Sequence, residues 1–314
     1  MSAAPAEAPS ALRIVIPFTI VTLIWGATWI VIIDQLGSVP PSWSITYRFI
    51  AAAGFMFVYA LATRTPMRLG LQGQIFALLF GVSQFVLNFN FVYRAELYIT
   101  SGLVAVTFAA LLVSNAVLGW IFLNQRMTGR FILGSAIAMG GIGLLFYNEL
   151  RVMPAGLAAV LAGLAFTFLG IFSASIANIM QATDRARALP MPSLLAWGMF
   201  YGVIVNAAWA WASAGPPAFE WRLGYVAGIV YLGGFASAIA FTLYFNLIRV
   251  IGPARAAYSS VLVPVIAMIM STLFEDYRWS WYAAAGGVFV LIGLVVALRG
   301  RERPPVPQPF GREG

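Results

Sequence analysis

The sequence predicts an all-α integral membrane protein with ten transmembrane helices, arranged as two inverted five-helix repeats with both termini in the cytoplasm. Composition, the spacing of apolar runs and the distribution of charge support this prediction. Of the 314 residues, 61% are hydrophobic and 9% are charged, whereas a soluble domain has about 45–50% apolar and about 25% charged residues. The mean hydropathy is +0.90. A chain this apolar needs lipid as its solvent, which excludes both a soluble and a disordered protein.

Apolar runs of the length that crosses a bilayer follow one another along the chain. A span needs about 20 apolar residues, and the connections between these runs are short, which leaves no room for a soluble domain. We expect spans at about residues 13–33, 41–62, 74–93, 100–123, 130–147, 155–180, 191–212, 223–248, 253–274 and 281–298. We further expect a disordered tail at residues 1–12 and a cytoplasmic Arg/Pro-rich tail at residues 300–314.

Charge in the predicted loops alternates from one side of the membrane to the other. One set of loops carries Arg13, Arg64, Arg68, Arg126, Arg130, Arg185, Arg187, Arg249, Arg255, Arg299, Arg301 and Arg303. The opposite set carries only Arg94, Arg151, Arg222 and Arg278, together with the acids Asp34, Glu96, Glu149, Glu220, Glu275 and Asp276. Because Arg-rich loops stay cytoplasmic, both termini are expected in the cytoplasm. The membrane that holds the chain is expected to be the inner membrane of the cell. With nine or eleven spans, the Arg-rich and the Arg-poor loops would no longer separate onto opposite sides of the membrane, so ten spans are favoured.

The two halves of the chain resemble each other at an offset of about 151 residues. Gly134 and Gly141 in the first half correspond to Gly286 and Gly293 in the second, with the same spacing of seven. We therefore expect one five-helix repeat at 13–148 and another at 153–299; chance similarity between apolar segments is the alternative. Five spans are an odd number, so the second repeat is inverted, as in secondary transporters that bind substrate near the midplane. The glycine faces predict close packing of the fifth and tenth spans, as a scaffold.

Several short motifs resemble one family of transporters. They are the run Gly252-Pro253-Ala254-Arg255-Ala256-Ala257 with Pro264 and Glu275 downstream, Trp25-Gly26 in the first span and Arg48-Phe49 in the second. Through them the chain resembles the drug/metabolite transporter superfamily, EamA type, over about residues 17–298. It departs from the family pattern at Asn124-Gln125-Arg126 and at Asp276-Tyr277. Within the superfamily, its length and aromatic content are most similar to the aromatic amino-acid exporters of the YddG type.

The resemblance implies a central cavity formed by spans 1, 3, 4, 6, 8 and 9. Few charged residues lie inside the predicted spans, and the clearest is Arg48, about seven residues into span two. Span two is peripheral in the family pattern. We therefore expect the Arg48 side chain to snorkel toward the membrane surface or to brace a loop. The cavity is therefore expected to be neutral and lined by aromatic residues. We predict substrate-binding roles for Trp25, Ser83, Asn88, Thr107, Phe108, Ser237, Phe241, Tyr244, Tyr258 and Ser259. The alternatives are core packing for Trp25 and bonding of Ser and Thr hydroxyls to their own i−4 carbonyls.

Glycine and proline inside the cavity spans indicate where these helices bend. A proline removes one backbone hydrogen bond in mid-span and leaves a carbonyl free, and a free carbonyl can accept a bond from an ammonium group. We therefore predict hinges at Gly81, Gly233, Gly234 and Pro264.

The residue types that are missing exclude most chemistry. The chain has no Cys, no His and no Lys, so it lacks a thiolate metal site, the usual general base and a Schiff-base lysine. We expect no cofactor, no metal, no nucleic-acid partner and no enzymatic activity. The expected partners are membrane lipids and a small solute, and the chain is expected to be a monomer.

These exclusions favour a transporter that exports amino acids, aromatic and other largely apolar ones, by alternating access. With no buried acid in evidence, transport is expected to be facilitated or weakly coupled to protons. A drug or hydrophobic-metabolite exporter of the same fold is the alternative, and a channel or sensory subunit is a further one.

Overall fold

The computed structural model describes residues 11–124, 127–152, 156–247 and 259–299, and within these ranges helices are joined by short loops and no strand is present. Within these ranges, eight helices are long and apolar enough to cross a membrane. They cover Ile14–Asp34, Pro41–Ala62, Gly70–Ala95, Ser101–Leu123, Gly129–Asn148, Gly156–Ala182, Met191–Ala214 and Leu223–Leu247. Two shorter apolar helices follow, Leu262–Phe274 and Trp281–Ala297. The chain is thus a multi-pass membrane protein, and its helices lie close to the predicted spans.

The elements follow the predicted order in both halves of the chain. The first half contains α1 (Ala11–Asp34), α2 (Pro41–Ala62), α3 (Gly70–Gly81), η1 (Val82–Leu87), α4 (Asn88–Ala95), α5 (Ser101–Thr107), η2 (Phe108–Ala110), α6 (Leu111–Leu123) and α7 (Gly129–Val152). The second half contains α8 (Gly156–Ala182), α9 (Asp184–Arg187), α10 (Met191–Ala214), α11 (Leu223–Val230), η3 (Tyr231–Ile239), α13 (Ser259–Phe274) and α14 (Trp281–Arg299). The tail predicted for residues 300–314 and most of that at 1–12 lie outside the described residues; α1 begins at Ala11.

Local sequence accounts for where these helices begin and end. Pro41 stands in the first turn of α2, and Pro192 stands in the first turn of α10. Proline is tolerated there because the first N–H groups of a helix have no intrahelical acceptor. Asn124 ends α6 in the left-handed conformation, with φ of 53°, which Asn adopts more readily than most residues.

The third long apolar helix of each half contains a π-helical segment, which the sequence analysis did not predict. In the first half η1 joins α3 to α4, and in the second half η3 follows α11. Side chains from other helices bond carbonyls inside both segments: Asn206 Nδ2 donates to Phe85 O at 3.0 Å, and Trp25 Nε1 donates to Ala236 O at 3.1 Å. π segments occur frequently at functional sites, and their matching positions agree with an internal repeat.

A 3₁₀ turn, η2, lies inside the membrane-length helix Ser101–Leu123, which matches the span predicted at residues 100–123. The sequence analysis did not predict this turn. The segment from Val106 to Ala110 contains no proline or glycine to mark it, so neither composition nor periodicity could locate it.

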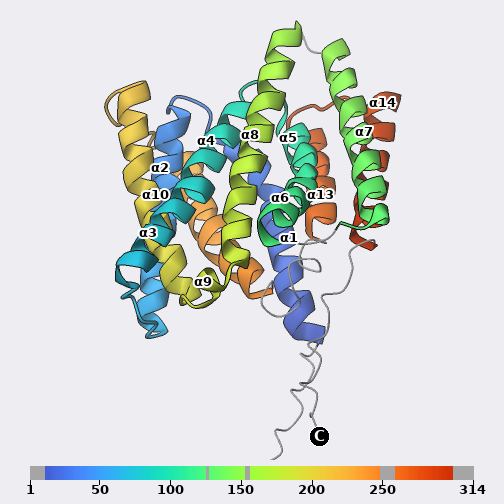
Figure 1. Ribbon diagram of the computed structural model, residues 1–314. Helices are drawn as coiled ribbons and strands as arrows, with labels where there is room; N and C mark the ends of the chain where they lie inside the picture. Colours follow the sequence, from blue (N-terminus) through green and yellow to red (C-terminus); the bar gives the residue numbers. More distant parts are fainter. Residues whose placement is uncertain (1–10, 125–126, 153–155, 248–258, 300–314) are drawn as a thin grey trace, which may run out of the picture.

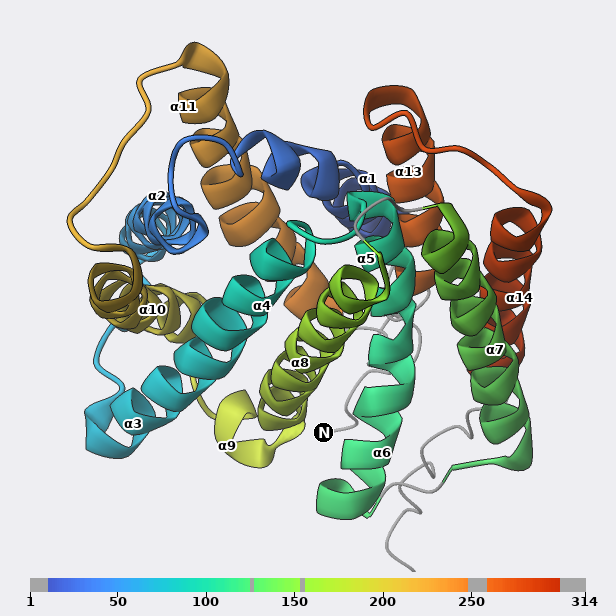
Figure 2. The same ribbon diagram turned by 90° about the horizontal axis from the view of Figure 1, so that it is seen from above.

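Helices α7 and α14 pack against each other along the two glycine faces, at one edge of the molecule (Figures 1 and 2). A Cβ atom on Gly141 would lie 2.6 Å from the Gly286 carbonyl oxygen, and one on Gly286 would lie 2.7 Å from the Gly141 oxygen. Gly134 and Gly293 approach each other in the same reciprocal way. The predicted close packing of these two helices is confirmed.

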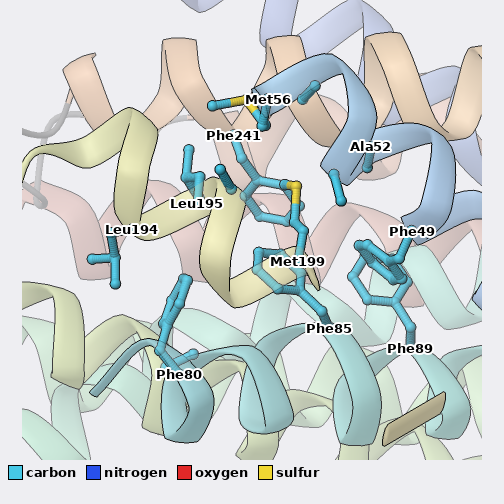
Figure 3. Packing of buried hydrophobic residues seen from close by; sticks show 14 of the residues in the cluster. Phe49, Ala52, Met56, Phe80, Phe85, Phe89, Leu194, Leu195, Met199 and Phe241 are labelled. Carbon is cyan, nitrogen blue, oxygen red and sulfur yellow. The ribbon is translucent and has the colours of Figure 1, made fainter. Parts of the chain in front are cut away.

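The largest packed core lies at the opposite edge, where α2, α10 and the α3–η1–α4 helix meet (Figure 2). Phe85 is fully buried there, with its ring 5.1 Å from Phe49 and 5.4 Å from Phe80, centroid to centroid. Figure 3 shows these rings together with Met199 of α10 and Phe241. In lipid such packing is stabilised by van der Waals contact rather than by removal from water. The core holds one wall of the cavity described next.

Candidate substrate cavity

A cavity of about 160 Å³ lies among helices from both halves of the chain. A water molecule needs roughly 10–15 Å³, so the cavity has room for a small solute. Its lining comprises Trp25, Thr28, Trp29, Ile32, Arg48, Gln84, Asn88, Phe89, Val92, Ala105, Phe108, Ala109, Leu111, Ala174, Asn178, Phe241, Tyr244, Val263 and Pro264. These residues come from the six spans that the family resemblance implies, with Arg48 added from α2.

Aromatic side chains form much of the cavity wall. The ring of Trp25 lies 5.4 Å from Phe241 and 4.9 Å from Tyr244, and Trp29 lies 5.3 Å from Phe108. Rings at these distances in tilted or edge arrangements attract one another beyond simple contact. Trp25 is further held by the bond from its indole N–H to Ala236 O. The aromatic part of the wall is therefore apolar and held by contacts between its rings.

Arg48 brings a positive charge into this apolar cavity. Its side chain is 1% exposed, its Nε donates to Ser237 Oγ at 3.0 Å, and its guanidinium carbon lies 4.3 Å from the ring centroid of Phe89. None of the ion pairs among the described side chains includes Arg48. Such a cation needs an anionic partner or a bound ligand, because an isolated charge is costly in a low-dielectric site.

The expectations that Arg48 snorkels or braces a loop, and that the cavity is neutral, are wrong. Helix α2 lies against η3 at a place where Gly233 has no side chain; a Cβ there would lie 2.7 Å from the Arg48 carbonyl oxygen. This close approach lets the Arg48 side chain reach across to Ser237 on η3 rather than toward the membrane surface.

Six of the residues singled out from the sequence line the cavity: Trp25, Asn88, Phe108, Phe241, Tyr244 and Pro264. Ser83 instead donates to Ser173 O at 2.7 Å, and Thr107 donates to Leu103 O at 2.8 Å, which is the i−4 bonding that was left as an alternative. Ser237 lies behind the lining and accepts from Arg48. Tyr258 lies outside the described residues, and Ser259 begins α13 with its side chain outside them.

Three of the four predicted hinges are places of close helix packing. A Cβ on Gly81 would collide with the Gly198 carbonyl of α10, and one on Gly234 would lie 2.9 Å from the Phe55 ring. Gly233 faces α2, as described above. The hinge role of these three glycines stays a prediction. Pro264 of α13 is buried, and the bending of α13 at this residue also stays a prediction.

Sequence reasoning missed Trp29, Gln84 and Asn178 as lining residues. Trp29 lies one helical turn after Trp25, so the periodicity of α1 already carried a signal for it. Asn178 is in α8, a span for which no residue was singled out, and donates to Asn115 Oδ1 at 3.4 Å. No comparable sequence signal marks Gln84.

A buried acid lies where α4 ends and the chain turns into α5. Glu96 is 6% exposed, and both its carboxylate oxygens have no hydrogen-bond partner among the residues described. Glu275, at the end of α13, accepts from the backbone N–H of Ser101 at 3.1 Å and from the Ser101 hydroxyl. Burial and the nearby Glu275 raise the pKa of Glu96 well above its ordinary value, while Arg48 opposes them. The expectation that no acid is buried is therefore wrong.

The model of the EamA-like transporter family matches this chain twice, over residues 12–147 and 154–299. The chain belongs to that family. As an EamA-family member of the drug/metabolite transporter superfamily, it is a transporter.

Named proteins that resemble this EamA-family chain are similar along most of its length. Protein PagO of Salmonella typhimurium is 24% identical over 285 residues, which cover 90% of each chain. A probable amino-acid metabolite efflux pump of Escherichia coli is 22% identical, over 90% of this chain and 93% of its own. One crystal structure superimposes with a TM-score of 0.67 over 94% of this chain and 100% of its own, at 16% identity. That last likeness concerns the fold alone.

Proposed function

We propose that this transporter exports amino acids, aromatic and other largely apolar ones, by alternating access through the central cavity. The observation that carries the proposal is a single buried cation, Arg48, in a cavity whose wall is otherwise dominated by aromatic and aliphatic side chains. An apolar amino acid has the matching chemistry: a carboxylate for the guanidinium and an apolar side chain for the rings.

The lining also disfavours other cargoes of the superfamily. A phosphate or a dicarboxylate calls for several cationic side chains, and Arg48 is the only cation among the lining residues described. One of the relatives reported above is a probable amino-acid metabolite efflux pump, which supports the proposed substrate class.

The proposal includes the topology and the energetics expected from the sequence. Ten helices in two inverted repeats, at 13–148 and 153–299, cross the inner membrane with both termini in the cytoplasm. Although Glu96 is buried, it does not line the cavity, and the proposal keeps the solute gradient as the driving force, with weak proton coupling at most. Accumulation of substrate by an imposed pH gradient in proteoliposomes would contradict this last point.

An exporter of drugs or other small hydrophobic metabolites is the second candidate. The aliphatic part of the lining, which includes Ile32, Val92 and Val263, favours it, because this part offers no polar group to a solute. The two candidates differ in whether the solute must carry a carboxylate.

The test is uptake into proteoliposomes that contain the purified protein. Radiolabelled Phe, Tyr, Trp, Met and Thr are offered, with protein-free liposomes as the background control. Saturable uptake of at least one of them, competed by the same unlabelled amino acid, supports the proposal. If all five remain at background while a lipophilic cation or neutral drug is transported, the second candidate replaces it.

A further inference from the structure

We infer that the cavity binds an α-amino acid by both of its charged ends, with Arg48 and Trp29 contacting the carboxylate and Asn88 contacting the ammonium group. This inference rests on the proposed function and names the atoms that recognise the solute. It is carried by three buried polar atoms that have no hydrogen-bond partner among the described residues and that belong to three residues lining one cavity: Arg48 Nη1, Trp29 Nε1 and Asn88 Oδ1.

Two of these three atoms are donors. The Nε of Arg48 is used by Ser237, so the guanidinium is held in place while its Nη1 remains without a partner. Trp29 Nε1 is likewise unpartnered, in contrast to Trp25, whose indole N–H is bonded to Ala236 O. A buried donor without an acceptor is rare and costly. Two such donors, one of them charged, fit the two oxygens of a carboxylate.

The third atom is an acceptor. Asn88 is 5% exposed and is the first residue of α4, directly after the π-helical segment η1. Its Oδ1 has no donor partner. No described carboxylate lines the cavity, so an ammonium group inside it meets a neutral amide oxygen and not an ion pair. A positively charged group is also kept away from Arg48 by repulsion, which assigns the two ends of the solute to different residues.

The remainder of the solute is placed by the aromatic wall. With the carboxylate at Arg48 and the ammonium group at Asn88, an apolar side chain is left to contact rings such as Trp25, Phe108 and Tyr244. Because one end of the solute is bound by a charge and the other by a neutral amide, the carboxylate contributes more to affinity than the ammonium group.

Binding of phenylalanine and three analogues tests this assignment. Intrinsic tryptophan fluorescence of the detergent-purified protein reports binding, and inhibition of amino-acid uptake in proteoliposomes provides an independent measurement. The probes are phenylalanine, 2-phenylethylamine without the carboxylate, phenylalaninamide with a neutral amide in its place, and 3-phenylpropionate without the ammonium group. We expect Kd to rise about 30-fold or more for the two probes without the carboxylate and about 10-fold for 3-phenylpropionate.

Variants assign each effect to a residue. Arg48→Gln is expected to bind phenylalanine and 2-phenylethylamine within about 3-fold of each other, and Asn88→Leu is expected to bind phenylalanine and 3-phenylpropionate within about 3-fold. Trp29→Phe removes the indole N–H together with one of the two fused rings, keeps an aromatic side chain against Phe108, and is expected to weaken all carboxylates about equally. Arg68→Gln, which removes the same charge at an exposed position outside the cavity, is the control and keeps the wild-type pattern.

Size-exclusion profile and Tm establish that a variant is folded; if Arg48→Gln is not, Arg48→Lys serves, and it is expected to keep part of the preference for a carboxylate. If the wild type transports amino acids and binds 2-phenylethylamine as well as phenylalanine, the inference is wrong while the proposed function stands. The same holds if Arg48→Gln keeps the 30-fold preference. If only non-carboxylate compounds are bound and transported, the proposed function itself fails.

Discussion

The Nε atom of Arg48 donates a hydrogen bond to Oγ of Ser237 at 3.0 Å, and this bond joins α2 of the first half of the chain to η3 of the second. Ser237 has no contact with the cavity. The hydrogen bond indicates the role of Ser237. By accepting from Nε, Ser237 fixes the orientation of the Arg48 guanidinium group, which could otherwise adopt several rotamers.

Removing that bond should weaken transport without removing the charge. For Ser237→Ala we expect the KM for a transported amino acid to rise about 3- to 10-fold, the effect of one hydrogen bond to a charged group, while Tm changes little. Uptake kinetics in proteoliposomes measure this. Ser83→Ala, which also removes a buried hydroxyl but lies outside the cavity lining, should leave KM unchanged. Equal KM values in the two variants would show that Ser237 does not position Arg48.

The helix pair α7–α14 should depend on its glycines for stability and not for binding. Gly141→Val places a branched side chain where the Gly286 carbonyl lies 2.6 Å from the Cβ position. We expect a loss of about 1–3 kcal/mol or more from overpacking, seen as a lower Tm in detergent with an unchanged KM. Gly140→Val is the matched control, because a Cβ on the neighbouring Gly140 meets nothing within 4 Å. Similar Tm values for both variants would contradict the packing argument.

Much of this fold was accessible from the sequence because a bilayer imposes its own length on apolar segments. The predicted span at 41–62 coincides with α2, and the glycine spacing of seven identified the α7–α14 contact. The orientation of Arg48 was not accessible. A helix that is apolar on all sides has no polar face to indicate which side points inward, and the contact with Gly233 that turns Arg48 inward joins residues 185 positions apart in the sequence.

Fine structure within the spans was also beyond the sequence. The π-helical segments η1 and η3 leave no sequence signal that separates them from the α-helical residues on either side. The hydroxyls of Ser83 and Thr107 show a related limit: each has a carbonyl in reach, and only the packed helices decide whether it bonds that carbonyl or faces a solute. Composition could indicate which residue types line the cavity. It could not show that Asn88 lines the cavity while Ser83 bonds the Ser173 carbonyl.

Asn206 of α10 should stabilise the π-helical segment η1. Its Nδ2 donates to Phe85 O at 3.0 Å, and its Oδ1 accepts from Asn90 Nδ2 at 2.7 Å. Asn206→Leu leaves both partners buried and unpaired at these bonds, which costs about 1–3 kcal/mol, so we expect a clear fall in Tm. Ser213→Ala, at an exposed position of the same helix, is the control and should keep the wild-type Tm. A wild-type Tm for Asn206→Leu would remove this role.

Glu96 should make the stability of the protein fall as the pH rises. Because burial and Glu275 raise the pKa of Glu96 well above its ordinary value in the folded protein, the folded state binds this proton more tightly than the unfolded state does. The resulting stability is fully present below the ordinary pKa of a glutamate. It is lost as the pH rises through the raised, folded-state pKa, because a charged Glu96 is buried beside a second acid.

The variant Glu96→Gln isolates this contribution, since its amide resembles the protonated acid and does not titrate. We expect the Tm of the wild type in detergent to fall more steeply between pH 5 and pH 9 than that of Glu96→Gln, and the variant to be the more stable of the two at the alkaline end. Asp184→Asn, which neutralises an exposed acid on α9, should follow the wild-type curve. Parallel curves for wild type and Glu96→Gln would mean that Glu96 keeps the same protonation state in the folded and unfolded protein, and that the burial of its carboxylate is relieved by a group outside the described residues.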